Sequence, residues 1–128
     1  MRPASRDEIV VIDDHPEHLD YLATLLRRAG YGVAAFNRAA PALCHLKRFG
    51  ARLVITDVCM PEKDGFEVLR EVKRDFPQLP LIAVSGIGPR EQALYLASIQ
   101  HLGADATFAK PIDAAALLAR VATLVAVP

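Results

Sequence analysis

The sequence predicts an α/β layered domain with a doubly wound parallel sheet of five strands. Short, wholly apolar runs alternate along the chain with longer segments whose apolar residues recur at helical spacing. These runs lack the alternation of a half-exposed strand, so each strand is expected to be buried on both faces by helices. Turn-forming residues separate the units at short intervals, and five strand–helix units account for the chain.

The five expected strands are short and rich in apolar residues. Their side chains do not alternate between apolar and polar, which favours the centre of a parallel sheet. The third strand ends directly before Asp57, and the fourth ends directly before Ser85. The strands are expected at residues 9–12, 33–36, 53–56, 81–84 and 106–109.

Residues that begin and end helices lie between these runs. Gly30 favours the end of the first helix, because glycine adopts the left-handed conformation at low cost. Asn37 can cap the second helix, whose first turn tolerates Pro41. The third helix is expected to end before Pro77, and a fourth should span about 90–102. A final helix follows the fifth strand, which makes five helices.

Composition favours one domain without a direct nucleic-acid or membrane partner. The 128 residues are 52% hydrophobic and 23% charged, which is typical of a compact domain. The 15 basic side chains balance the 15 acidic ones, so no basic excess indicates binding to phosphate backbones. No apolar run is long enough to cross a bilayer. We expect a disordered leader over 1–7 and a single domain over 8–127.

The two cysteines indicate a reduced, cytoplasmic protein. Cys44 and Cys59 have no second pair nearby, so neither a disulfide framework nor a four-ligand zinc site is expected. Cys44 is interpreted as a packing or surface residue. Cys59 stands two residues after Asp57. A redox role would require a lowered thiol pKa, and nothing in the sequence indicates one.

Polar residues gather where the expected strands end. Asp13 and Asp14 follow the first strand, Asp57 the third, Ser85 the fourth and Lys110 the fifth. Ligands of open parallel sheets bind outside the carboxyl ends of the strands. Three carboxylates, a hydroxyl and an ammonium group are therefore expected at one edge of the sheet.

Four motifs carry a specific resemblance. IVVIDD, VITDVCMPEKDG, LIAVSG and FAKP follow one another over residues 9–111. In this order and at about this spacing they resemble the receiver domain of bacterial response regulators, over nearly the whole chain. The resemblance implies a flavodoxin-like fold with strand order 2-1-3-4-5. It also implies a phosphoacceptor, not an enzyme, with at most self-phosphorylation from small donors and self-dephosphorylation.

The acidic residues predict a metal site. Two carboxylates about 4 Å apart repel one another by roughly 4 kcal/mol at an effective dielectric constant of about 20. A hard divalent cation with oxygen ligands relieves this repulsion. The resemblance implies Mg²⁺, bound directly by Asp14, Asp57 and the backbone carbonyl of Cys59, with Asp13 acting through water.

The resemblance also assigns the phosphoryl chemistry. Asp57 would be the nucleophile that takes a phosphoryl group from a histidine kinase or a histidine phosphotransfer protein. Lys110 would pair with a phosphate oxygen, and Ser85 would move to hydrogen-bond another. The signal would then pass to a downstream protein by conformational change, by contacts or by onward phosphotransfer.

One position departs from the family pattern. Receivers usually carry Tyr or Phe three residues before the lysine, and this ring turns inward on activation. Here the position is Thr107, and the aromatic residue is Phe108. Adjacent strand residues point to opposite faces, so Phe108 is not expected to replace the ring. Thr107 is therefore a doubtful switch position.

Simpler structural roles are open for the same residues. Asp14 and Glu17 are spaced like a capping box, with Pro16 suited to a first helical turn. Asp57 and Ser85 can serve as turn residues. Lys110, before Pro111, can be a solvated surface lysine.

The four histidines have structural interpretations too. His15 and His18 lie one helical turn apart, as metal ligands can, but a solvated helix face explains them better. His45 and His101 are interpreted as packing or surface residues.

Three rival functions remain. A haloacid-dehalogenase-like phosphatase would need an acid two residues after the nucleophile, where Cys59 stands. A flavodoxin-like carrier would need a Ser/Thr/Gly-rich phosphate loop, but 13–16 is acidic and would repel the phosphate of FMN. A receiver-like interaction module that is never phosphorylated would not need Asp14, Asp57 and Lys110 together.

Overall fold

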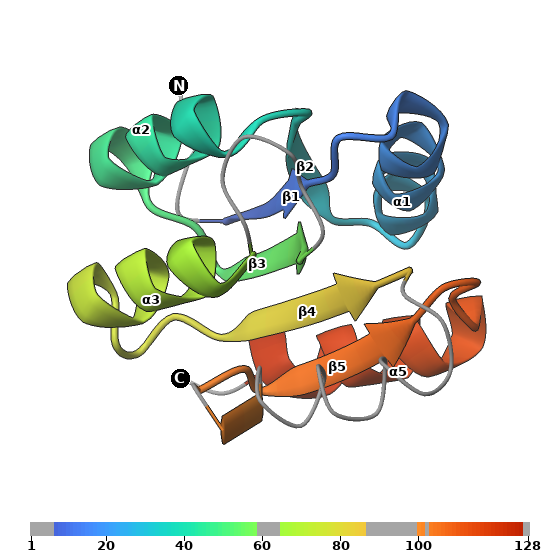
Figure 1. Cartoon of the computed structure of the whole chain (residues 1–128). Coiled ribbons are helices and arrows are strands. Elements are labelled where there is room, and N and C mark those ends of the chain that lie inside the picture. The colour runs from blue at the N-terminus through green and yellow to red at the C-terminus, as the bar shows by residue number, and fades with distance from the viewer. Residues whose placement is uncertain (1–6, 59–64, 87–99, 102, 127–128) are drawn as a thin grey trace.

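A five-stranded parallel sheet forms the centre of the molecule (Figure 1). The structure is a computed structural model that describes residues 7–58, 65–86, 100–101 and 103–126. The strand order is β2-β1-β3-β4-β5, as the resemblance implies, and all neighbouring strands are parallel. The strands are β1 (Glu8–Ile12), β2 (Gly32–Phe36), β3 (Leu53–Asp57), β4 (Leu81–Ser85) and β5 (Ala106–Ala109).

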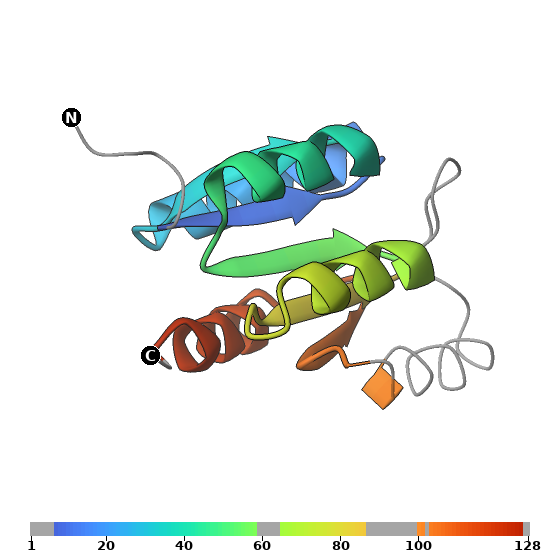
Figure 2. The ribbon, with the colours of Figure 1, turned by 90° about the vertical axis from the view of Figure 1, so that its left-hand side faces the viewer.

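Helices cover both faces of this sheet. Figure 2 shows α2 and α3 in front of it, and α1 and α5 lie on the other face. Successive strand residues alternate between two buried apolar clusters, one under each helix pair. Every residue of the central strands β3 and β4 is buried, which explains their lack of alternation. The described helices are α1 (Pro16–Arg28), α2 (Ala39–Phe49), α3 (Gly65–Asp75) and α5 (Ala114–Val125).

The strands begin and end within one residue of their predicted positions, and one helix cap was predicted wrongly. Gly30 follows α1 with φ of 99°, in the left-handed conformation expected of it. The N-cap of α2 is Arg38, not Asn37, and no side chain caps this helix. Pro41 is consequently the third residue of α2, where its missing N–H is among those without an intrahelical partner. The fourth helix lies outside the described residues, apart from the helical residues 100–101.

A polar link anchors β4 and β5 at their amino ends. The Lys73 ammonium donates to the Leu79 carbonyl at 2.8 Å and to Oδ2 of Asp105 at 3.1 Å. The same carboxylate oxygen accepts the Leu81 N–H at 2.8 Å. This contact ties the two strands together at their amino ends, at the edge of the sheet opposite to their carboxyl ends. None of the described helices is long and apolar enough to span a bilayer.

The buried face of α1 should contribute strongly to stability. Leu26 is fully buried between α1 and the sheet, whereas its neighbour Leu25 is only partly buried. We expect Leu26→Ala to lower the free energy of unfolding by about 2–5 kcal/mol, because it leaves a cavity. Leu25→Ala, the matched control on the same helix, should cost less than about half of that. Urea unfolding measures both, and equal losses would contradict this placement of the core.

Candidate functional site

The predicted polar residues meet at the carboxyl ends of the strands. Asp57 and Ser85 are the last residues of β3 and β4, whereas Asp13 and Lys110 directly follow β1 and β5. Asp13 and Asp57 are only 1% and 2% exposed, and Ser85 is fully buried. Asp14 lies beside Asp13, and we call Asp13, Asp14 and Asp57 the acidic cluster.

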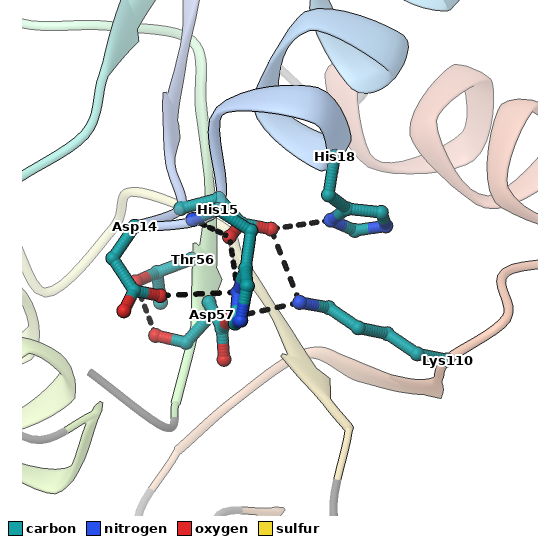
Figure 3. A network of polar contacts seen from close by, with 7 residues as sticks. Asp14, His15, His18, Thr56, Asp57 and Lys110 are labelled. Atoms are coloured by element: carbon teal, nitrogen blue, oxygen red, sulfur yellow. Dashed lines mark hydrogen bonds and ion pairs between the residues drawn. The ribbon is translucent and has the colours of Figure 1, made fainter.

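Lys110 connects two members of the acidic cluster. Its ammonium nitrogen donates to Oδ2 of Asp57 at 2.9 Å and lies 3.3 Å from Oδ2 of Asp13 (Figure 3). Burial alone would lower the pKa of Lys110, but the hydrogen bond and charge of Asp57, together with Asp13, raise it above its ordinary value. The ammonium therefore stays charged at neutral pH, and Lys110 is not a solvated surface lysine.

Protein donors already occupy both carboxylate oxygens of Asp13. Oδ1 accepts the His15 backbone N–H at 2.9 Å, and Oδ2 contacts both the His18 ring and Lys110. Burial favours a raised pKa for Asp13, but these donors and nearby charges outweigh it and lower the pKa. Asp13 is thus held as a carboxylate whose lone pairs are largely engaged, which suits a contact with an ion through water.

Asp14 differs from Asp13 in having a carboxylate oxygen that no hydrogen bond from the described residues engages. Its side chain is 25% exposed, and its Oδ1 atom is buried without a hydrogen bond from the described residues. The capping-box interpretation is wrong, because the N-cap of α1 is His15 and no side chain caps the helix. Pro16 does occupy the first turn of the helix, as expected. A buried carboxylate oxygen without a donor is a fitting ligand for a cation.

The N-cap and first turn of α1 bring two histidines, His15 and His18, to the acidic cluster. Nδ1 of His15 lies 3.3 Å from Asp14 Oδ1, 3.4 Å from Asp13 Oδ1 and 3.8 Å from Asp57 Oδ2. The His18 ring contacts Asp13 and is only 20% exposed on its side chain. The interpretation as a solvated helix face is therefore wrong for His18, whereas the His15 side chain is 66% exposed and reaches the carboxylates only with Nδ1. The connection from β1 to α1 is so short that the helix begins directly above the carboxylates.

The other histidines and the described cysteine fit their predicted structural roles. Nε2 of His45 lies 3.6 Å from a Glu8 carboxylate oxygen, and the His45 ring contacts the rings of Phe36 and Phe49. His101 and Cys44 are exposed.

The donor set and the charge of the cluster fit a divalent cation. Ligand atoms of the acidic cluster and His15 all lie within 4.8 Å of one another. At an effective dielectric constant of about 20, two carboxylates at that separation repel by about 3.5 kcal/mol. Lys110 offsets only one of the three negative charges. Hard oxygen donors suit Mg²⁺. The predicted carbonyl ligand, Cys59, lies outside the described residues.

The ends of β4 and β5 place the remaining predicted residues. The Ser85 carbonyl accepts the Lys110 backbone N–H at 2.8 Å. Thr107 pairs with Ala83 in the ladder, whereas Phe108 packs in the cluster under α1 and α5. The two residues thus face opposite sides of the sheet, as the strand geometry predicts.

Sequence reasoning missed the part that three neighbours play in the site. A Cβ on Gly86 would come within 3.3 Å of Lys110 Cδ, so the glycine leaves room for the lysine stem. The Thr56 hydroxyl donates to the Asp57 carbonyl at 3.0 Å. His15 was noticed only for its spacing from His18. Its position directly after two aspartates was the signal that could have identified it.

Comparisons with known proteins agree with this geometry. The family model described as the response regulator receiver domain matches residues 9–122. The regulatory protein VanRc of Enterococcus gallinarum is 31% identical over 119 residues, which cover 91% of this chain and 49% of VanRc. The transcriptional regulatory protein ZraR of Escherichia coli K12 is 34% identical over 109 residues, 83% of this chain and 23% of ZraR. The chain therefore spans about half of VanRc and about a quarter of ZraR.

Solved structures show the same architecture over nearly the full chain. The receiver domain of NtrX from Brucella abortus has a TM-score of 0.85 and 28% identity, covering 94% of this chain and 100% of that one. A CheY-like receiver domain protein from Methanospirillum hungatei has a TM-score of 0.83 and 25% identity, covering 95% of both chains.

Crowded negative charge predicts that the apoprotein gains stability when Asp14 is neutralised. Asp14→Asn removes repulsion with Asp13 and Asp57, so in a chelating buffer it should stabilise the protein by about 1–2 kcal/mol, allowing for partial exposure. If Asp14 is a direct ligand, Mg²⁺ should stabilise the wild type but not the variant, because a ligand stabilises only the protein that binds it. Thermal and urea unfolding with and without Mg²⁺ provide the test.

Asp20→Asn is the matched control, since Asp20 is an exposed aspartate on α1. It should leave both the stability and the Mg²⁺ response near those of the wild type. An Asp14→Asn protein that is less stable than the wild type in chelator, or that keeps the full Mg²⁺ response, would refute this interpretation.

Proposed function

Because the chain belongs to the response regulator receiver family, we propose that it accepts a phosphoryl group on Asp57 and passes the signal on through the groups around it. The single observation that carries the proposal is the Lys110 ammonium between Asp57 and Asp13, inside a buried cluster of carboxylates. Such a cluster needs a partner cation. The family assignment makes the chain a phosphoacceptor and not an enzyme that turns over a substrate.

The proposed reaction is a transfer between two protein side chains. A carboxylate oxygen of Asp57 attacks the phosphorus of a phosphohistidine, the N–P bond breaks, and an acyl phosphate forms on Asp57. The leaving imidazole takes a proton from solvent. Lys110 neutralises negative charge on the phosphoryl oxygens, as positioned cations do in other phosphoryl transfers.

Mg²⁺ is the proposed cofactor of this step. Asp14 and Asp57, with the backbone carbonyl of Cys59, would hold the ion directly, and Asp13 would act through water. The bound ion supplies positive charge opposite the incoming phosphoryl group. The Oδ1 atom of Asp14, which accepts no hydrogen bond from the described residues, and the engaged oxygens of Asp13 support this division of roles.

Ser85 and Lys110 are the proposed source of the conformational response. Phosphorylation adds about −1.5 to −2 charges, and a two-state domain responds through contacts that differ between its states. Lys110 can exchange its Asp57 contact for a phosphoryl oxygen, and Ser85 can move toward another. Thr107 offers no ring to turn inward, so we propose that aromatic switching is not the output of this chain.

The proposed partners are proteins. A histidine kinase or histidine phosphotransfer protein would donate the phosphoryl group, and a downstream protein would read the altered surface. We propose one receiver unit over 8–127, acting in the cytoplasm without direct contact to nucleic acid or membrane. The balanced charge of the chain supports the last point.

Asp57 should be the site of modification. With Mg²⁺ and a small phosphodonor, we expect wild-type protein to gain the mass of one phosphoryl group, and Asp57→Asn to gain none. Asp20→Asn, which removes an exposed carboxylate instead, should behave as the wild type. Intact-mass spectrometry measures all three. Equal uptake by wild type and Asp57→Asn would end the assignment, and no uptake by either would favour an interaction module that is never phosphorylated.

Lys110 should couple the modification to the ends of β4 and β5. In the wild type, beryllium fluoride, a phosphoryl mimic, should shift the backbone amide signals of Ser85 and Gly86 in NMR spectra. Lys110→Ala should reduce these shifts to less than about half, because the cation that follows the phosphoryl oxygens is lost.

Lys73→Ala is the control for this experiment, because it removes another partly buried lysine paired with an aspartate. It should keep the shifts at the ends of the strands. A full response in Lys110→Ala would show that another group carries the signal.

A further inference from the structure

His15 stands apart from the residues that the proposed phosphoryl chemistry uses. Its ring nitrogen Nδ1 lies 3.3, 3.4 and 3.8 Å from carboxylate oxygens of Asp14, Asp13 and Asp57. Figure 3 shows the His15 ring in the middle of the site, between Asp14 and Lys110 and close to Asp57. The side chain is 66% exposed, so the nitrogen reaches the cluster from a rim that is open to ions from solvent.

We propose that His15 is a nitrogen ligand that gives the acidic cluster a preference for a first-row transition metal, such as Co²⁺ or Zn²⁺, beyond that of carboxylates alone. The inference rests on the metal site of the proposed function and adds a fourth side chain to it. Mg²⁺ gains little from an imidazole because it prefers oxygen donors, whereas imidazole suits Zn²⁺ and its neighbours.

The distances around His15 fit the coordination geometry of such an ion. Bonds of about 2.0–2.2 Å in a tetrahedral site place neighbouring ligand atoms about 3.3–3.6 Å apart. An octahedral Mg²⁺ site, with bonds of about 2.0–2.1 Å, brings neighbouring ligands to about 2.8–3.0 Å. The spacing from His15 to Asp14 lies in the first range, and the spacing to Asp57 is only slightly beyond it.

The backbone holds His15 in this position. The residue is the extended N-cap of α1, with φ of −90° and ψ of 109°, and Pro16 begins the helix. The His15 N–H donates to Asp13 Oδ1, which ties the backbone of the ligand to the cluster. His18 is not part of this group of ligand atoms, and its ring contacts the Asp13 oxygen that also faces Lys110.

Metal titration of His15 variants tests the inference. Co²⁺ is followed by its visible absorption and Mg²⁺ by calorimetry, in slightly alkaline buffer, for wild type, His15→Ala and His15→Asn. The asparagine variant keeps a good N-cap residue, so loss of the helix cannot imitate loss of the ligand. We expect both variants to lose about tenfold or more in Co²⁺ affinity relative to their change in Mg²⁺ affinity, with an altered Co²⁺ spectrum.

Two control variants sharpen the result. His101→Ala removes an exposed imidazole away from the site and should match the wild type. The inference is overturned if the His15 variants keep the Co²⁺ affinity and spectrum, if they lose Co²⁺ and Mg²⁺ affinity equally, or if only His18→Ala alters the spectrum. Phosphoryl uptake by wild type and Asp57→Asn in Mg²⁺ decides the proposed function separately, so the two failures are distinguishable.

Discussion

The ion pair between Lys110 and Asp57 is the contact on which the arrangement of the site depends. Asp57 ends β3 and Lys110 follows β5, so the lysine side chain extends past the end of the intervening β4 to reach it. This reach depends on strands that end level with one another, and Gly86 leaves room for the lysine stem, because a Cβ there would lie 3.3 Å from Lys110 Cδ. Lys110 is the basic side chain that the strand ends supply to this cluster. Without its ammonium group, the three buried or half-buried carboxylates would repel one another with no positive charge from the strand ends to offset the repulsion.

The parallel sheet explains why such a cluster is tolerated. Side chains that follow parallel strands emerge at the same edge, and the apolar strands behind them are buried on both faces. The sheet can therefore hold carboxylates in a crowded arrangement because its core supplies the stability. The carboxylates repel one another in the folded protein, and their uncompensated negative charge attracts cations. The site is thus prepared for a ligand that the fold itself does not need.

The fold and most of the site could be predicted because both follow from local patterns. Unbroken apolar runs located the strands, and Asp13, Asp14, Asp57, Ser85 and Lys110 were found because they directly follow those runs. The strand order was predicted from the family resemblance, because an apolar run does not indicate which strands lie next to it in the sheet. The cap of α2 and the environment of His15 and His18 were missed for another reason. Both depend on the direction in which the chain leaves a strand, which residue types do not encode.

The acidic cluster also makes this electrically neutral chain strongly polarised. Three carboxylates and Lys110 leave 12 acidic and 14 basic side chains elsewhere, so a local charge of −2 is balanced by +2 over the remainder. A divalent ion would neutralise the strand ends and leave the molecule as a cation, and a phosphoryl group would then return it close to neutrality. Each state has its own dipole. The electrostatic potential of the protein extends about 8–10 Å from its surface, the screening length at physiological salt. A charged partner at that distance would therefore experience a different field in each state of the site, before any contact forms.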